Sequence, residues 1–209
     1  MKISVFGANG KVGSLVVDEL LRNNFQVVAF CYGKTSFRPN NNLTVIRGNV
    51  YNRQDVDRAI KGSEAVISTL GSWGSKNKDI LSEGMKNIVA IMDHYRIKRI
   101  VSLTGADAHI EGEYLKTHDK LMRVFIKLFA KKILIDGEIH IEILKNSDLN
   151  WTVLRSPVMN NKGNPKEFIL SNKKTKPWNS VNRASVALCL IELLSENKCI
   201  KQAPFIKRA

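Results

Sequence analysis

The sequence predicts an α/β protein in which a doubly wound parallel sheet lies between two layers of helices, with a small C-terminal cap region. Short apolar segments alternate with amphipathic helical segments through the first half of the chain. Such alternation is typical of right-handed βαβ units. A glycine-rich loop also joins the first apolar segment to the first helical segment. Together these observations indicate a three-layer α/β/α sheet of the Rossmann type.

Each predicted strand is a short run rich in β-branched or aromatic residues. The strands are expected at residues 3–6, 26–31, 43–46, 65–69, 99–103 and 151–154, with an edge strand at 204–206. Apolar residues at helical spacing predict helices after the first loop and at residues 53–60, 78–95, 119–134, 137–145 and 185–194. Asn52 and Asn182 directly precede two of these helices and are expected to cap them.

The chain of 209 residues is long enough for one domain with a full core, so we expect a single domain over residues 1–209. Residues 107–145 and 156–180 are less regular and are expected as substrate-side or cap segments. Ligands of doubly wound sheets bind beyond the carboxyl ends of the strands. The candidate ligand-binding segments are therefore those that follow the strands, at residues 7–13, 31–38, 48–50, 69–74 and 104–107.

The first loop carries glycines at Gly7, Gly10 and Gly13, in the spacing GxxGxxG. Gly7 permits a tight turn out of the strand, Gly10 lets a ligand approach the backbone, and Gly13 lets the helix pack closely on the sheet. The helix that follows directs unpaired N–H groups and a positive dipole end at the turn. This arrangement is suited to a pyrophosphate group. The alternative is a glycine-rich turn that binds nothing.

The end of the second strand indicates which dinucleotide would bind there. Sites that prefer NAD carry an acidic residue at this position, which binds the ribose hydroxyls. Tyr32 occupies it here, and no acidic residue occurs between Glu19 and Asp55. The cations in this region, Lys34, Arg38 and Lys11, favour a 2′-phosphate and hence NADP over NAD. Alternatively, these cations are ordinary surface charges of a loop.

Hydroxyl groups near the strand ends are the candidates for the reacting end of the cofactor. Thr104 follows the fifth strand and is the candidate catalytic residue, although a threonine bonded to the turn backbone would look the same. Ser72 lies after the fourth strand, and Ser102, whose side chain should point away from that of Leu103, is a further candidate with a place in the core as the alternative. The side chains of Glu138 and Glu142, one helical turn apart, are expected to be solvated charges rather than an acid/base pair.

Several other classes of site are not expected from the sequence. It contains no GxSxG, no HExxH and no CxxC motif, so we expect neither a hydrolase elbow nor a metal site. The three cysteines favour a reduced, cytoplasmic setting. Neither a leader nor a membrane span is expected. The scattered histidines are expected at the surface or satisfied in the core: His94, His109, His118 and His140.

The formal net charge of +14 is high and could indicate nucleic acid, an anionic membrane surface or acidic ligands. The basic residues are spread along the chain and no nucleic-acid motif occurs, so a solvated basic surface is favoured and nucleic acid is not expected. One basic stripe stands out in the predicted helix 119–134, opposite an apolar face expected to cover the substrate pocket or a dimer contact: Lys120, Arg123, Lys127 and Lys131.

Several stretches resemble the atypical short-chain dehydrogenases/reductases, in particular the NAD(P)H-binding group with flavin reductase/biliverdin reductase B and NmrA-like proteins. The stretches are GANGKVG (7–13), RGNV (47–50), VISTLGS (66–72), SEGMKNIVAIMDHYRIKRIVSLT (82–104) and LKNSDLNWTVLRSP (144–157). Taken together with the positions of the loops after the strands, the resemblance implies that the following residues bind the cofactor: Gly7, Ala8, Asn9, Gly10, Lys11, Val12, Gly13, Tyr32, Lys34, Asn49, Val50, Thr69, Leu70, Gly71, Ser72, Thr104, Gly105, Pro157 and Val158.

The chain departs from the family pattern in four places. It lacks the YxxxK pair of ordinary short-chain dehydrogenases. Tyr32 stands where atypical reductases carry a basic residue, and Asn49 stands where relatives carry an Asp at the adenine. Gly105 replaces the hydroxyl residue that flavin reductase relatives carry after the threonine.

Three functions are consistent with these observations. The first is an NAD(P)H-dependent reductase of a planar small-molecule acceptor, such as a flavin or a quinone. The second is a non-catalytic NADP sensor of NmrA-like type that binds a partner protein, which the missing YxxxK pair and Gly105 favour. The third is an anion or nucleic-acid binder that uses the basic stripe. A monomer or a homodimer is expected.

Overall fold

The computed structural model describes residues 1–114, 117–174, 176 and 178–209, with the side chain of His118 outside the described part. Its helices are α1 (Gly13–Arg22), α2 (Arg53–Ile60), α3 (Ile80–His94), α4 (Thr117–Lys145) and α5 (Arg183–Ser195). Its strands are β1 (Lys2–Phe6), β2 (Gln26–Cys31), β3 (Leu43–Arg47), β4 (Ala65–Ser68), β5 (Arg99–Gly105), β6 (Asn150–Ser156), β7 (Val158–Asn160), β8 (Phe168–Ser171), β9 (Ser180–Asn182) and β10 (Phe205–Arg208).

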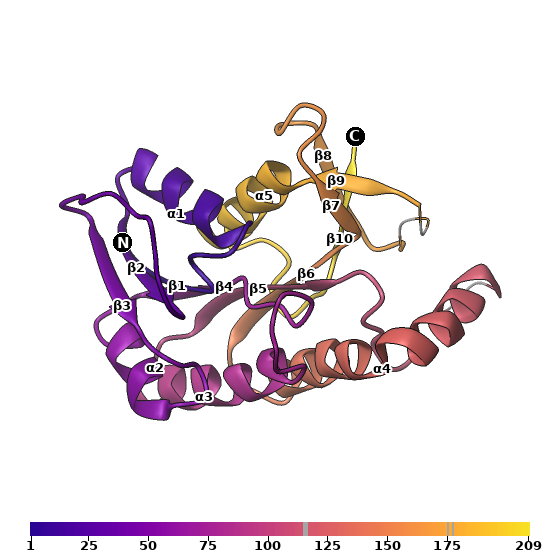
Figure 1. The fold of residues 1–209 in the computed structure, drawn as a ribbon, viewed down its shortest axis with the longest axis horizontal. Coiled ribbons are helices and arrows are strands. Elements are labelled where there is room, and N and C mark those ends of the chain that lie inside the picture. Colours follow the sequence, from indigo (N-terminus) through magenta and orange to yellow (C-terminus); the bar gives the residue numbers. More distant parts are fainter. Residues whose placement is uncertain (115–116, 175, 177) are drawn as a thin grey trace.

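The main sheet has the order β3-β2-β1-β4-β5-β6-β10-β8, in which only β8 runs antiparallel to its neighbour. Helices α1 and α5 cover one face, and α2, α3 and α4 cover the other (Figure 1). Strands β7 and β9 form a small second sheet. This arrangement confirms the predicted doubly wound, three-layer fold.

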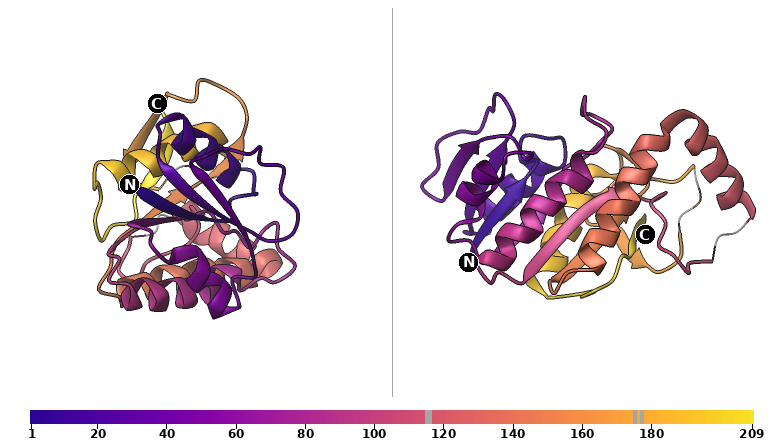
Figure 2. Two further views of the ribbon diagram at one scale, coloured as in Figure 1. Left: turned by 90° about the vertical axis from the view of Figure 1, so that its left-hand side faces the viewer. Right: turned by 90° about the horizontal axis from the view of Figure 1, so that it is seen from below.

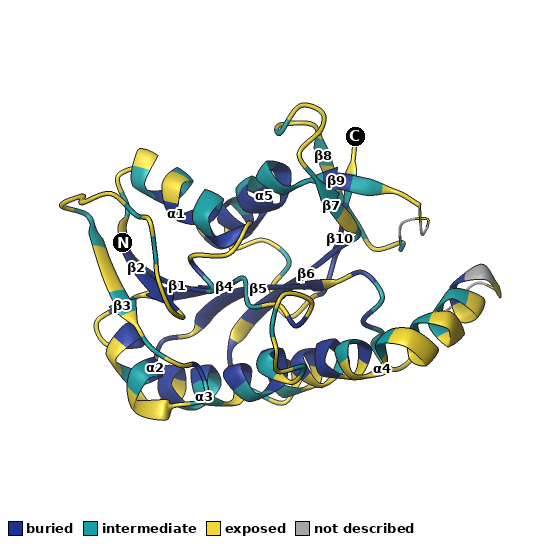
Figure 3. Cartoon of the chain, viewed as in Figure 1, coloured by how far each residue is buried: buried dark blue, intermediate teal, exposed yellow. Residues whose placement is uncertain are grey.

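The core has two parts because successive side chains of a strand point to opposite faces of the sheet. Ile3 and Val5 of β1 pack in the cluster beneath α1 and α5, whereas Phe6 packs with Phe30 in the cluster beneath α2, α3 and α4. The central strands are therefore buried on both faces, as Figure 3 shows.

Two helix caps have the predicted geometry. The Asn52 side chain accepts a hydrogen bond from the Gln54 N–H at 2.9 Å, and the Asn182 side chain accepts one from the Ala184 N–H at 2.9 Å. Each cap satisfies an N–H group that has no partner within its helix.

Two predictions of elements are wrong. Residues 204–206 were expected as an edge strand, but β10 lies between β6 and β8, because Phe168–Ser171 in the expected cap segment pairs with it and forms the edge. The two helices expected at 119–134 and 137–145 are joined as α4, and the interruption falls at Ala130, where φ is −140° and ψ is 32°. Within the described residues, no helix is both long and apolar enough to cross a membrane.

The apolar face expected of the helix at 119–134 does not cover the substrate side in this structure. The C-terminal part of α4 lies beside α3 on the sheet, whereas its N-terminal part extends past the sheet (Figures 1 and 2). Leu128 and Phe129 in this part are 75 % and 76 % exposed. The substrate-pocket alternative was wrong because periodicity finds an apolar face but not what lies against it, and the dimer-contact alternative stays a prediction.

Candidate functional site

The loops that follow the strands meet at one edge of the sheet. Parallel pairing sets Phe6 beside Phe30 and Ser68, and sets Ser68 beside Ser102. At the next pair, Gly105 lies beside Ser156. Because these residues end their strands, the loops after β1, β2, β4, β5 and β6 open on the same side.

The three glycines of the first loop have different local roles. Gly7 has a φ of +71°, and a Cβ there would lie 2.9 Å from the Thr69 carbonyl oxygen. A Cβ on Gly13 would lie 2.1 Å from the Gly7 carbonyl oxygen, so no side chain fits where α1 meets the loop. At Gly10 a Cβ would contact only the Gly7 carbonyl oxygen, at 3.1 Å. Gly7 and Gly13 therefore serve the packing of the loop, whereas Gly10 borders open space.

Two side chains hold this loop in place. The Thr69 hydroxyl donates to the carbonyl oxygens of Phe6 (2.9 Å) and Gly7 (3.2 Å). The Asn9 amide donates to the carbonyl oxygens of Tyr32 (2.8 Å) and Lys34 (3.2 Å). The Asn9 bridge joins the loop after β1 to the loop after β2, a contact that the spacing of the glycines does not reveal.

The start of α1 fits an anionic group. The residue before the helix is Val12, which has no side-chain acceptor, and the first turn contains no acidic residue. The Ser14 N–H already donates to the Gly10 carbonyl oxygen at 3.0 Å, and the Val16 N–H donates to the Val12 carbonyl oxygen at 3.0 Å. The other N–H groups of the first turn are left to a ligand or to water. The helix dipole has its positive end here, which favours an anion. Among the described residues, only one heavy atom outside the chain neighbours of Gly10 lies within 4 Å of its Cβ position, which leaves room for such a group. These residues fit the diphosphate of a dinucleotide.

The adenosine side of this edge is lined by exposed groups. Tyr32 is 76 % exposed, and Lys34, Arg38 and Asn49 are also exposed. The Asn49 N–H donates to the Asp55 carboxylate at 2.8 Å, and this bond lowers the pKa of Asp55, with help from Arg58. The Asp55 carboxylate is thus occupied by its own loop, and the cations face solvent.

The hydroxyl groups near the strand ends differ in what they contact. Ser72 donates to the Asp136 carboxylate of α4, which also accepts from the N–H groups of Leu81 (3.0 Å) and Ser82 (2.8 Å). Ser72 and Asp136 are both buried. The Ser72 hydroxyl therefore anchors its loop to α4 and the start of α3. Sequence reasoning missed Asp136, because nothing in the local pattern indicates that α3 begins beside it.

Ser102 and Thr104 both face α4. Ser102 lies 3.0 Å from His140 Nε2, and burial lowers the pKa of His140 to about 4, so this imidazole is neutral near pH 7. This pair confirms Ser102 as a core residue. Thr104 is 6 % exposed, and a Cβ on Gly137 would lie 2.9 Å from its hydroxyl. Gly105, next to it, is exposed and has no heavy atom within 4 Å of its Cβ position.

The remaining candidates divide by their burial. Buried residues are Ala8, Val12, Gly13, Val50, Ser72 and Thr104. Intermediate residues are Gly7, Thr69, Leu70 and Pro157, and exposed residues are Asn9, Gly10, Lys11, Tyr32, Lys34, Asn49, Gly71, Gly105 and Val158.

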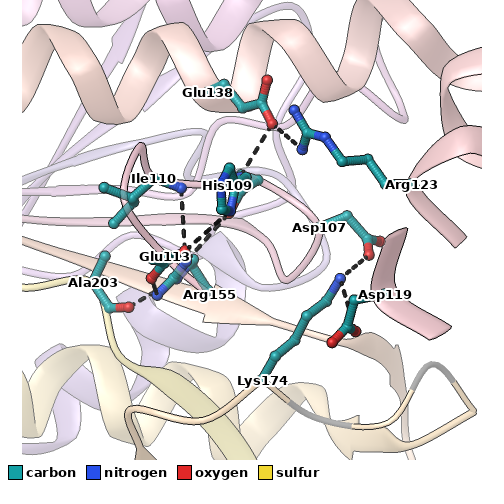
Figure 4. Close-up of polar contacts among 11 residues, drawn as sticks. Asp107, His109, Ile110, Glu113, Asp119, Arg123, Glu138, Arg155, Lys174 and Ala203 are labelled. Atoms are coloured by element: carbon teal, nitrogen blue, oxygen red, sulfur yellow. Dashed lines mark hydrogen bonds and ion pairs between the residues drawn. The ribbon is translucent and has the colours of Figure 1, made fainter. Parts of the chain in front are cut away.

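An ion-pair network fixes the loop after β5 (Figure 4). Arg155 of β6 is buried and makes two bonds to the Glu113 carboxylate, at 2.7 and 2.6 Å. Burial would raise the pKa of Glu113, but the Arg155 guanidinium, together with the Ile110 N–H and His109, holds this pKa below its usual value. The Ala203 carbonyl oxygen accepts from Arg155 Nε at 2.8 Å.

Two more ion pairs tie this loop to α4 and to the loop after β8 (Figure 4). Glu138 pairs with Arg123 and accepts from the His109 N–H, so the prediction of a solvated Glu138 is wrong. Lys174 pairs with Asp107 at 2.9 Å and lies 3.6 Å from Asp119. The substrate-side segments are thus held together by charges that their separate sequence positions did not predict.

Comparison with known proteins gives consistent matches. A family model described as NAD(P)H-binding matches residues 7–197. An uncharacterised chloroplastic protein of Arabidopsis thaliana is 25 % identical over 100 % of this chain and 77 % of its own length.

Two solved structures share the fold. A short-chain dehydrogenase/reductase of Veillonella parvula in complex with NADP has a TM-score of 0.79 at 19 % identity, covering 99 % of this chain and 94 % of its own. ChuY of Escherichia coli O157:H7, described as an anaerobilin reductase, has a TM-score of 0.77 at 18 % identity, covering 100 % and 97 %. At these identities the likeness establishes the fold alone.

Proposed function

Because the chain belongs to the NAD(P)H-binding family, we propose that it is an NADPH-dependent reductase of a planar small molecule such as a flavin or a quinone. The observation that carries the proposal is the start of α1, where Val12 makes no side-chain cap and a Cβ on Gly10 would contact only the Gly7 carbonyl oxygen. In this proposal the protein acts in the cytoplasm as a monomer or homodimer and does not bind nucleic acid.

The residues around the opening have separate binding roles. The first-turn N–H groups of α1 bind the diphosphate, and Lys34, Arg38 and Lys11 favour a 2′-phosphate, because no carboxylate competes for them at the end of β2. The bound cofactor supplies a hydride from its nicotinamide. Thr104, Gly105, Pro157 and Val158 border the position of that ring in the proposal.

The substrate side presents apolar and aromatic groups to solvent. Trp73, Val158 and Trp178 are 73 %, 71 % and 75 % exposed. Trp73 lies on the loop after β4, Val158 begins β7, and Trp178 lies on the loop after β8. Flat apolar surfaces of this kind suit an aromatic acceptor. The reductase described for ChuY, a protein of the same fold, is consistent with this class of reaction.

The test is a titration of the purified protein with NADPH and with NADH by calorimetry, followed by NADPH oxidation with FMN and with quinones. The proposal expects tighter binding of NADPH and stimulated oxidation with at least one acceptor. If neither nucleotide binds, the proposed role of the glycine loop in nucleotide binding is contradicted. Binding of NADPH without turnover would contradict the reductase and favour the second candidate.

The second candidate is a non-catalytic NADP sensor that binds a partner protein. It is favoured by the hydroxyl groups: Ser72 is bonded to Asp136, Ser102 is bonded to His140, and Gly105 has no hydroxyl. Of the hydroxyl residues considered from the sequence, Thr104 is the one left to deliver a proton in the reductase proposal. Turnover that survives Thr104→Val would show that the acceptor takes its proton from water.

A further inference from the structure

The N-terminal part of α4, residues 117–129, is here called the arm. It extends past the end of the sheet, away from α3 (Figures 1 and 2). Ala130 interrupts the helical φ and ψ angles directly after it. The apolar residues of α4 that enter the core follow this interruption: Leu134, Ile141 and Leu144. The arm itself buries no apolar side chain.

The arm has a continuous apolar face that is exposed to solvent. Its members are Leu121 (73 % exposed), Val124 (56 %), Phe125 (56 %), Leu128 (75 %) and Phe129 (76 %). Their spacing of i, i+3, i+4, i+7 and i+8 places them on one side of a helix. The rings of Phe125 and Phe129 lie 4.7 Å apart between centroids, so the face includes an aromatic pair.

The charges beside this face are all positive. Lys120, Lys127, Lys131 and Lys132 are exposed, and Arg123 pairs with Glu138. No acidic residue occurs between Asp119 and Asp136, and the whole chain carries a formal net charge of +14. An amphipathic helix with Phe and Leu on one face and lysines beside it has the composition of helices that lie in a membrane interface.

We propose that the arm docks this protein onto an anionic lipid surface. The apolar face enters the boundary between headgroups and acyl chains, and the lysine stems extend along it so that their ammonium groups reach lipid phosphates. A second copy of the chain would bring two sets of lysines together, and a nucleic acid would leave the apolar side chains in water. An anionic bilayer satisfies both the charge and the apolar face.

The experiment measures cosedimentation of the full chain with phosphatidylcholine vesicles, with and without phosphatidylglycerol. We expect binding to the vesicles that contain phosphatidylglycerol, and weaker binding as salt is added. Phe125→Ser with Phe129→Ser removes the aromatic pair, and Lys120→Glu with Lys127→Glu reverses two charges. Each double variant should weaken vesicle binding on the order of tenfold or more.

Matched controls separate the arm from general properties of the protein. Ile169→Ser removes an exposed apolar side chain of β8, which is 50 % exposed. Lys61→Glu with Lys162→Glu reverses two exposed charges away from the arm, with the same change in net charge. Both controls should bind vesicles as the unaltered protein does. Thermal unfolding by circular dichroism verifies that every variant remains folded.

Three results would overturn the proposal. The first is absence of vesicle binding by the unaltered protein at low salt. The second is equal loss of binding in the arm variants and the charge-matched control, which would assign the binding to net charge alone. The third is a dimer, detected by sedimentation velocity, that the Phe125 and Phe129 substitutions dissociate, together with no vesicle binding. That result would assign the apolar face to contact with a second copy of the chain. None of these results depends on the proposed reductase activity.

Discussion

Replacing Gly10 by leucine should separate nucleotide binding from folding. A Cβ at Gly10 contacts one atom, the Gly7 carbonyl oxygen at 3.1 Å, and the rest of a leucine side chain would extend into the opening in front of α1. The contact requires a shift of a few tenths of an ångström, which we expect to cost about 1 kcal/mol of stability.

The loss of binding should be much larger than the loss of stability. A diphosphate in the opening would accept charge-assisted hydrogen bonds from the first-turn N–H groups, each contributing about 1.5–3 kcal/mol. Displacing two such bonds gives a loss of at least about 3 kcal/mol, or roughly a hundredfold in Kd for NADPH.

Gly13→Ala is the contrasting variant. Its Cβ would lie 2.1 Å from the Gly7 carbonyl oxygen and 2.7 Å from the Thr69 hydroxyl, so α1 and the loop must move apart. We expect a loss of about 3 kcal/mol in the free energy of unfolding. Calorimetry with NADPH and urea unfolding measure the two quantities. Unchanged NADPH affinity in Gly10→Leu, or a loss of stability equal to that of Gly13→Ala, would refute the assignment of the opening.

Three further predictions concern other parts of the site. Burial lowers the pKa of His140 to about 4, so between about pH 6.5 and 4 only the unfolded chain binds this proton and stability falls as the pH falls. His140→Gln should flatten this dependence, which unfolding in urea at several pH values measures. Asp136→Ala should lower the free energy of unfolding by about 3 kcal/mol because it leaves several buried donors without their acceptor, whereas Asp93→Ala, an exposed acid of α3, should change it by less than about 0.5 kcal/mol. Gly105→Ser should leave the melting temperature unchanged, because its side chain enters open space. It should raise turnover with NADPH and a quinone if proton delivery limits the rate, and unchanged turnover would show that proton delivery is not rate-limiting.

The parallel strands and their helices were predictable because their signals are local. A strand buried on both faces is a continuous apolar run, and Asn52 and Asn182 cap their helices within two residues. The place of β10 was not predictable in this way, because its antiparallel neighbour Phe168–Ser171 comes from a segment whose composition suggested a cap.

The groups around the site were predictable where one loop contains them and not where two elements meet. The roles of Gly7 and Gly13 in packing followed from their spacing, and the structure confirms both. Asp136, Glu113 and Arg155 gave no signal, because the role of each depends on a residue more than forty positions away in the chain. Burial decides such roles, and burial is a property of the assembled fold.

The Asn9 bridge has a consequence for the entropy of nucleotide capture. Its two bonds, to the Tyr32 and Lys34 carbonyl oxygens, connect the loop that would grip the diphosphate to the loop that would meet the ribose. The two loops are therefore fixed relative to each other when the chain folds, before any nucleotide binds. Nucleotide binding then costs less conformational entropy in these loops, because the Asn9 carboxamide already holds them in place.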